Sequence, residues 1–325
     1  MKNKSLTLFD AGIAFVFSFI LAQFTSAIGI IAVESFMQAF GQTEAQIIAF
    51  FDTATGYLLQ AIFMNIAFIL VFIWYAKRIN KKDLLAKPSD DTKKYMVTCV
   101  IIGLLTLFLL SGALNYFQLL LDKIGYKTTS LGYELNTPSN YLISLISLAV
   151  IPAICEELIF RGILVNALKS KGEIFAIILS SVMFSIFHFS PAQLIYPICF
   201  GLILSIVYLR TKNILFPILL HFINNALSIS IQYFSNSSGG TFSHSASNLI
   251  YAIITFAIWF LLIRHLFKDF KTHRETANKD NEENIAAEPH TNQSNNVKYS
   301  DKTNTTVLYG SIMLMMLVYI ILLFV

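Results

Sequence analysis

The chain contains about nine apolar runs, each long enough to cross a lipid bilayer as a helix. A hydrocarbon core about 30 Å thick needs roughly 20 apolar residues in a helix, and only helices or closed barrels satisfy the backbone hydrogen bonds there. Composition agrees, since 13% of the residues are charged, against about 25% in soluble domains. We therefore predict an all-α fold, a polytopic transmembrane helix bundle. The predicted spans lie near 8–33, 56–76, 95–117, 140–164, 173–190, 192–209, 213–233, 248–267 and 306–325.

The basic residues of the connecting segments predict the orientation of the bundle. Lys and Arg are frequent in segments 77–94 and 264–302, whereas segments 34–55 and 234–247 contain neither. Because basic loops stay in the cytoplasm, we predict a cytoplasmic amino terminus and a multi-pass protein of the cell membrane. Most basic residues lie in the connecting segments, so the formal charge of +4 does not indicate nucleic-acid binding.

Two adjacent carboxylates, Glu156 and Glu157, lie inside the predicted span 140–164. An ionised side chain at membrane depth is costly unless it is paired, hydrated or protonated. Glu157 and Arg161 are four residues apart on one helix face and can form an ion pair. Glu156 lies about 100° further round the helix and can point into a cavity. The spacing thus separates a paired carboxylate from a free one.

Two further polar clusters lie in later spans. His188 follows Phe184 by four residues, and Asn225 follows His221 by four, so that each pair shares a helical face. Taken singly, each polar residue is as consistent with an interhelical hydrogen bond as with a catalytic role. Taken together with Glu156, these groups are too costly to be present without a function.

The chemistry that these residue types allow is hydrolysis. A desolvated Glu can act as general base on water, and His can position that water, donate a proton or bind a metal. An Asn amide can stabilise an oxyanion. Glu156, His188 and His221 could supply three ligands to a catalytic zinc ion, or they could form a metal-free Glu–His site that activates water.

Taken in chain order, the three motifs resemble those of the CPBP family of intramembrane proteases, and the resemblance covers about 139–233. This family includes CAAX prenyl endopeptidases and the bacterial Abi proteins linked to bacteriocin processing and self-immunity. The resemblance leaves a zinc cofactor open. It implies roles for six residues: Glu156 as base or metal ligand, His188 as the second water-activating group, His221 and Asn225 at the oxyanion, and Glu157 with Arg161 bracing the helix.

The motifs and the apolar runs together predict how the chain is organised. The segment 268–305 is rich in Asn, Glu, Lys and Thr and has too few apolar residues to form a core. The predicted parts are N-terminal transmembrane helices (1–138), a CPBP/Abi-like catalytic core (139–233), an eighth transmembrane helix (234–267), a cytoplasmic disordered linker (268–305) and a C-terminal transmembrane anchor (306–325).

The favoured function is an intramembrane endopeptidase that cleaves a membrane-associated or lipidated protein or peptide. Its expected partners are that substrate and the lipid bilayer, and the site is expected to open from the cytoplasmic half of the bilayer. A non-catalytic membrane scaffold or bacteriocin self-immunity protein is the alternative. A proton-coupled transporter that uses Glu and His as a relay is a third interpretation.

The depth of His188 in its span conflicts with the other site residues. Glu156 and His221 lie about eight residues from the cytoplasmic ends of their predicted spans, whereas His188 lies about fifteen from residue 173. These groups meet only if the fifth helix begins outside the bilayer or if the turn at Ser190 and Pro191 is sunk within the protein.

Overall fold

The computed structural model describes residues 6–79, 84–85, 90–126, 132–237, 249–286 and 301–323. Within these ranges the chain is helical and contains no strand beyond a single β-bridge between Leu85 and Asn213. The predicted all-α, polytopic bundle is confirmed. Among the described residues, six helices are long and apolar enough to cross a membrane: Leu8–Ala39, Ala54–Ala76, Tyr95–Lys123, Pro138–Lys171, Pro191–Thr211 and Leu215–Ser235.

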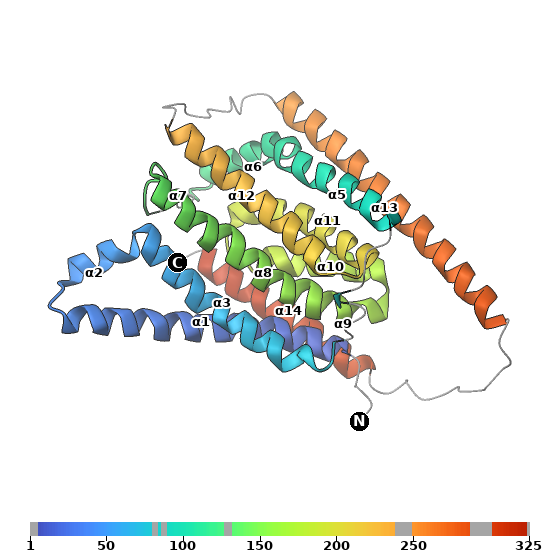
Figure 1. The fold of residues 1–325 in the computed structure, drawn as a ribbon, viewed down its shortest axis with the longest axis horizontal. Coiled ribbons are helices and arrows are strands. Elements are labelled where there is room, and N and C mark those ends of the chain that lie inside the picture. Colours follow the sequence, from blue (N-terminus) through green and yellow to red (C-terminus); the bar gives the residue numbers. More distant parts are fainter. Residues whose placement is uncertain are drawn as a thin grey trace.

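The amino-terminal helices are α1 (Leu8–Ala39), α2 (Glu44–Phe51) and α3 (Ala54–Ala76). Thr7 and Asp10 form a capping box that satisfies the first backbone N–H groups of α1. Asp10 also accepts two hydrogen bonds from Arg78, at 2.5 and 2.7 Å. This ion pair holds the start of α1 against the end of α3, at one end of the bundle (Figure 1).

The remaining outer helices are α5 (Asp90–Leu109), α6 (Ser111–Lys123), α13 (Leu249–Ala286) and α14 (Asp301–Leu323). Trp259 Nε1 on α13 donates to Thr106 Oγ1 on α5 at 3.2 Å. The last helix, α14, packs along α1, and a Cβ added at Gly12 would lie 2.9 Å from Ser311 Oγ. The last helix is therefore part of the bundle.

The segment predicted to be a disordered linker, 268–305, begins as helix. In α13 the helix continues without a break from Leu249 to Ala286, and residues 287–300 lie outside the described residues. The extension contains Lys, Glu, Arg and Ala, which are strong helix formers. Propagating an existing helix also avoids the cost of nucleation, so a polar composition does not prevent a helix here.

The central span alternates between α-helical and wider π-helical segments. It runs through α7 (Pro138–Ser144), η1 (Leu145–Val150), α8 (Ile151–Glu157), η2 (Leu158–Val165) and α9 (Asn166–Leu168), of which η1 and η2 are π-helical. Proline in a helix clashes with the carbonyl four residues earlier, and for Pro152 that carbonyl is Leu148 in η1. Such π segments are frequent at functional sites. Both glutamates lie on the short α8 between them.

The helices α10 (Glu173–Ile186) and α11 (Ile195–Thr211) form a tightly packed hairpin. With 14 residues, α10 is about 21 Å long at 1.5 Å per residue, too short to cross a bilayer and shorter than the predicted span 173–190. The chain turns through a short 3₁₀ helix at Pro191–Gln193, and Pro191 is buried. The turn is therefore sunk within the protein, which resolves the conflict in the depth of His188. The next helix is α12 (Leu215–Ser237).

Candidate active site

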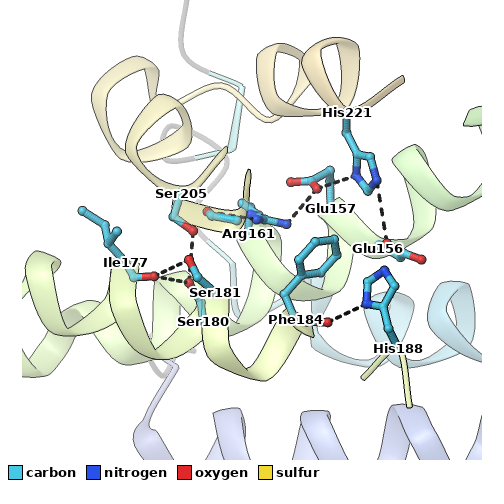
Figure 2. Close-up of polar contacts among 11 residues, drawn as sticks. Glu156, Glu157, Arg161, Ile177, Ser180, Ser181, Phe184, His188, Ser205 and His221 are labelled. Carbon is cyan, nitrogen blue, oxygen red and sulfur yellow. Dashed lines mark hydrogen bonds and ion pairs between the residues drawn. The ribbon is translucent and has the colours of Figure 1, made fainter. Parts of the chain in front are cut away.

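Residues from α8, α12 and the α10–α11 hairpin surround a cavity of about 670 Å³. Glu156 lies on α8, His188 follows the end of α10, and His221 and Asn225 lie on α12; all four line this cavity. The structure thus brings together the four residues that the motifs predicted. Figure 2 shows Glu156, His188 and His221 near Phe184, with Glu157 and Arg161 beside them.

Glu157 is the structural centre of the cluster. Its side chain is fully buried, and its Oε1 accepts a hydrogen bond from Arg161 Nη1 at 2.7 Å. The expected ion pair therefore forms. The same Oε1 lies 2.9 Å from Nδ1 of His221, a contact that the sequence did not predict because the two residues are far apart along the chain.

Arg161 is held by three further features of its surroundings. It is fully buried, donates from Nη2 to the carbonyl of Gly201 at 3.2 Å, and lies over the ring of Phe184, 4.8 Å from the centroid. A buried guanidinium needs such partners because its desolvation is costly. Arg161 thereby links α8 and η2 to α11 and to the motif around Phe184.

The hydrogen bonds of the two histidines determine which ring nitrogen carries a proton. His188 Nδ1 lies 2.9 Å from the carbonyl oxygen of Phe184, and His221 Nδ1 contacts the Glu157 carboxylate. Carbonyl and carboxylate oxygens only accept, so Nδ1 is the donor in both rings. In a neutral ring, Nε2 then keeps its lone pair. His221 Nε2 lies 3.9 Å from Glu156 Oε2, beyond hydrogen-bonding distance.

Phe184 contacts the guanidinium and both histidines. Its ring lies nearly perpendicular to those of His188 and His221, with centroids 4.9 and 5.8 Å apart, and Arg161 lies over the Phe184 ring. In Figure 2 the ring lies beside both histidines, next to Arg161, so it packs against both imidazoles and covers one face of the guanidinium.

Asn225 belongs to a chain of hydrogen bonds that the sequence did not predict. The hydroxyl of Tyr196 donates to Asn224 Oδ1 at 2.5 Å, and Asn224 Nδ2 donates to Asn225 Oδ1 at 3.2 Å. Asn225 Nδ2 in turn donates to the carbonyl of Leu148 at 3.1 Å, the oxygen that Pro152 crowds. The chain fixes the Asn225 amide and leaves its second N–H free, since an amide has two. In the sequence, the signal that points to Tyr196 is that it is an aromatic residue close to the His188 motif.

The residues that could hold a metal do not form a complete ligand set. Among the residues that the structure describes, no three His, Cys, Asp or Glu side chains are grouped as a metal site requires. Glu156 and His221 lie close to one another, but His188 is not placed to supply a third ligand to a metal ion beside them. The donor set therefore does not fit the three-ligand zinc site that was one of the two expectations.

An all-α membrane bundle with a carboxylate and two histidines around an internal cavity has the groups that hydrolysis within a membrane requires. Residues 138–227 match the family described as Type II CAAX prenyl endopeptidase Rce1-like. A protein of Bacillus subtilis (strain 168) described as "Putative membrane peptidase YdiL" is 26% identical over 221 residues, 67% of this chain and 87% of that protein. No solved structure gives a significant match. These two matches relate the chain to CAAX-type membrane peptidases, the group to which the three motifs pointed.

Proposed function

We propose that this protein is an intramembrane endopeptidase that hydrolyses a peptide bond in a membrane-associated or lipidated protein or peptide, by CAAX-type or bacteriocin-type processing. The observation that supports this function most is the hydrogen bonding of the two histidines. Nδ1 of His188 is bonded to the carbonyl of Phe184, and Nδ1 of His221 is bonded to the carboxylate of Glu157. Both rings line the cavity beside Glu156 and keep Nε2 for water or substrate. Such an arrangement suits general acid–base catalysis at a peptide carbonyl.

The charges of the cluster support a proton that moves during the reaction. Glu156 and Glu157 carry two negative charges when ionised, and Arg161 carries one positive charge. One additional proton, held by Glu156 or by His221 Nε2, makes the formal charge of the cluster zero and so avoids a net charge at membrane depth. Glu156 Oε2 and His221 Nε2 lie 3.9 Å apart, and the proton can pass between them through water or substrate.

With the shared proton on His221 Nε2, the ionised Glu156 is the base. It removes a proton from a water molecule positioned by His188, and the water oxygen forms a bond to the substrate carbonyl carbon. The free N–H of Asn225 and the imidazolium of His221 stabilise the resulting oxyanion. The tetrahedral intermediate then breaks its C–N bond, and Glu156 delivers the proton to the departing amine.

The test is proteolysis by purified, folded variants. We expect Glu156→Gln and His188→Ala to reduce cleavage of a quenched fluorescent peptide by about 100-fold or more. Glu44→Gln, on the exposed side of α2, serves as the control that changes a carboxylate elsewhere. Full activity of either site variant in a preparation with wild-type thermal stability contradicts the proposal.

The part played by a metal is tested separately. A zinc cofactor remains an expectation from the resemblance, whereas the side chains in place support water activation by Glu156 and the histidines alone. We expect activity to survive chelation and the purified protein to lack stoichiometric metal by elemental analysis. Loss of activity on chelation with recovery on adding zinc would assign the protein to the metalloproteases.

A further inference from the structure

The cavity continues well beyond the catalytic residues along one face of α12. His221, Asn225, Ser228 and Gln232 all line it, at helical spacings of four, three and four residues. At 1.5 Å per residue these positions extend over about 16 Å. His221 is buried, whereas Ser228 and Gln232 are exposed. The cavity therefore runs from the middle of the bundle toward the carboxyl end of α12 and opens in that direction.

The wall of this extension carries side-chain amides that have no hydrogen-bond partner among the described residues. Asn115 on α6, Gln193 at the α10–α11 turn and Gln232 on α12 all line the cavity. None of them makes a side-chain hydrogen bond within the part of the chain that the structure describes, whereas Asn224 and Asn225 beside the catalytic groups both do. Unpaired amides in a membrane protein are costly unless water or a ligand satisfies them.

The chemistry of these amides suits the main chain of an extended peptide. An Asn or Gln amide both donates and accepts, as does each peptide unit of a substrate. Among the described lining residues, the side chains with a carboxyl or imidazole group are Glu156, His188 and His221, all at the catalytic end. The extension has no Lys or Arg in its described lining to bind a carboxylate or phosphate, so it fits an internal peptide segment.

The two ends of the bundle differ in charge. The end where α12 finishes also contains α2 and the start of α7 (Figure 1), and its residues include Glu34, Glu44, Asp52 and Glu134. The opposite end contains the start of α1 and α9 (Figure 1). That end carries the basic residues Lys77, Arg78, Lys169, Lys171, Arg210 and Lys212.

We propose that the substrate peptide reaches the site from the acidic end of the bundle, which is the non-cytoplasmic side because basic ends face the cytoplasm. This reverses the expectation that the site opens from the cytoplasmic half. It rests on the proposed peptidase activity and narrows its substrates to polypeptide segments exposed on, or exported to, the outer side. The unpaired amides of the extension hold the main chain of that segment.

Orientation is tested first, by labelling single introduced cysteines. Gln42 and Lys171 are exposed at the two ends of the bundle, and the native Cys99, Cys155 and Cys199 are buried. In intact cells a membrane-impermeant maleimide should label the Gln42→Cys variant and should label Lys171→Cys only after permeabilisation. The reverse pattern overturns the proposal.

The side of cleavage is then measured with a mixed pool of hydrophilic quenched fluorescent decapeptides that do not cross membranes. Sealed right-side-out vesicles should cleave them at nearly the rate found after detergent is added, and Glu156→Gln vesicles should not. Cleavage only by inverted vesicles or only after detergent overturns the sidedness and leaves the peptidase intact. No Glu156-dependent cleavage even in detergent refutes the proposed function itself.

The role of the amides has its own test in detergent. Gln232→Ala should raise KM by about three- to tenfold, the value of one hydrogen bond, and leave kcat nearly unchanged. Gln118→Ala is the matched control, because Gln118 on α6 bonds Asp122 and lies outside the cavity lining. An unchanged KM for Gln232→Ala, or an equal rise in the control, contradicts a substrate-binding role for the extension.

Discussion

Glu156 and Glu157 are chemically identical neighbours, and their position on the helix gives them opposite environments. Successive residues of a helix point in directions about 100° apart. Glu157 is therefore fully buried in contact with Arg161 and His221, whereas Glu156 lines the cavity. One carboxylate therefore organises the site, and the other is available for chemistry. Mutating either one affects a different property of the protein.

Removing the charge of Glu157 should destabilise the protein. Glu157→Gln leaves the guanidinium of Arg161 buried without a counter-ion, which costs about 3–5 kcal/mol. Unfolding in detergent measures the loss, and the double variant Glu157→Gln with Arg161→Gln should recover part of it. Equal stability of the single and double variants would show that the two side chains are not coupled.

Tyr196 should affect turnover through Asn225. Tyr196→Phe removes the hydroxyl that donates to Asn224, so the amide of Asn225 is less well fixed at the oxyanion. We expect kcat to fall by about tenfold, a loss of roughly 1–1.5 kcal/mol, with KM within about twofold. Tyr116→Phe, on α6 outside the cavity lining, is the control. A change in KM alone would place Tyr196 in substrate binding.

At the residue scale the sequence predicted which side chains meet but not how they are bonded. The i,i+4 pair of Glu157 and Arg161 follows from helical geometry alone. The contact of Glu157 with His221 and the chain from Tyr196 to Asn225 join different helices. Tertiary packing decides such contacts, and the spacing of residues in one helix carries no information about them.

At the element scale, the α10–α11 hairpin shows where reasoning from apolar runs fails. The apolar run after residue 173 is long enough to suggest a span, but α10 ends at Ile186 and the chain turns inside the protein. Burial by neighbouring helices makes the turn tolerable. Hydropathy does not distinguish a residue that faces lipid from one that faces protein, so the sequence could not place this turn.

Close packing within the hairpin depends on Gly201. A Cβ at this position would lie 3.1 Å from the Cα of Ser181, and the carbonyl of Gly201 receives Arg161. Gly201→Ala should therefore cost about 1–3 kcal/mol of stability and reduce activity, as measured by unfolding and by proteolysis.

Gly310 provides the matched control for Gly201. It lies in α14 with no atom within 4 Å of an added Cβ, so Gly310→Ala should be neutral or stabilising by up to about 1 kcal/mol. An equal loss of stability in the two variants would mean that contact of Gly201 with Ser181 on α10 is not the cause.

At the scale of the whole molecule, the final helix belongs to the bundle. It packs along α1, where Gly12 allows close approach of Ser311 and Leu308. Its apolar run predicted a membrane helix but not this contact, because a sequence after a polar segment does not reveal which helix it meets. The two charged ends of the bundle, in contrast, follow directly from the positions of Lys and Arg.

Blocking the contact between α1 and α14 should weaken the whole bundle. Gly12→Leu places a side chain against the backbone of Leu308, and we expect a loss of about 1–3 kcal/mol measured by unfolding in detergent. A chain shortened before Asp301 should lose a similar amount, and adding Gly12→Leu to it should cost little more. A full additional loss in the shortened chain would show that Gly12 acts elsewhere.

The π-helical segments on either side of α8 make the number of residues in this span more important than their identity. Removing one residue from Leu145–Val150 would turn everything after it by about 100° relative to α7. Glu157 would then occupy the place of Glu156 in the cavity, and the Glu157–Arg161 pair would turn away from its partners His221 and Gly201 on other helices, although every motif would still be present. Related chains can therefore exchange apolar side chains here freely, while an insertion or deletion of one residue would abolish the protease.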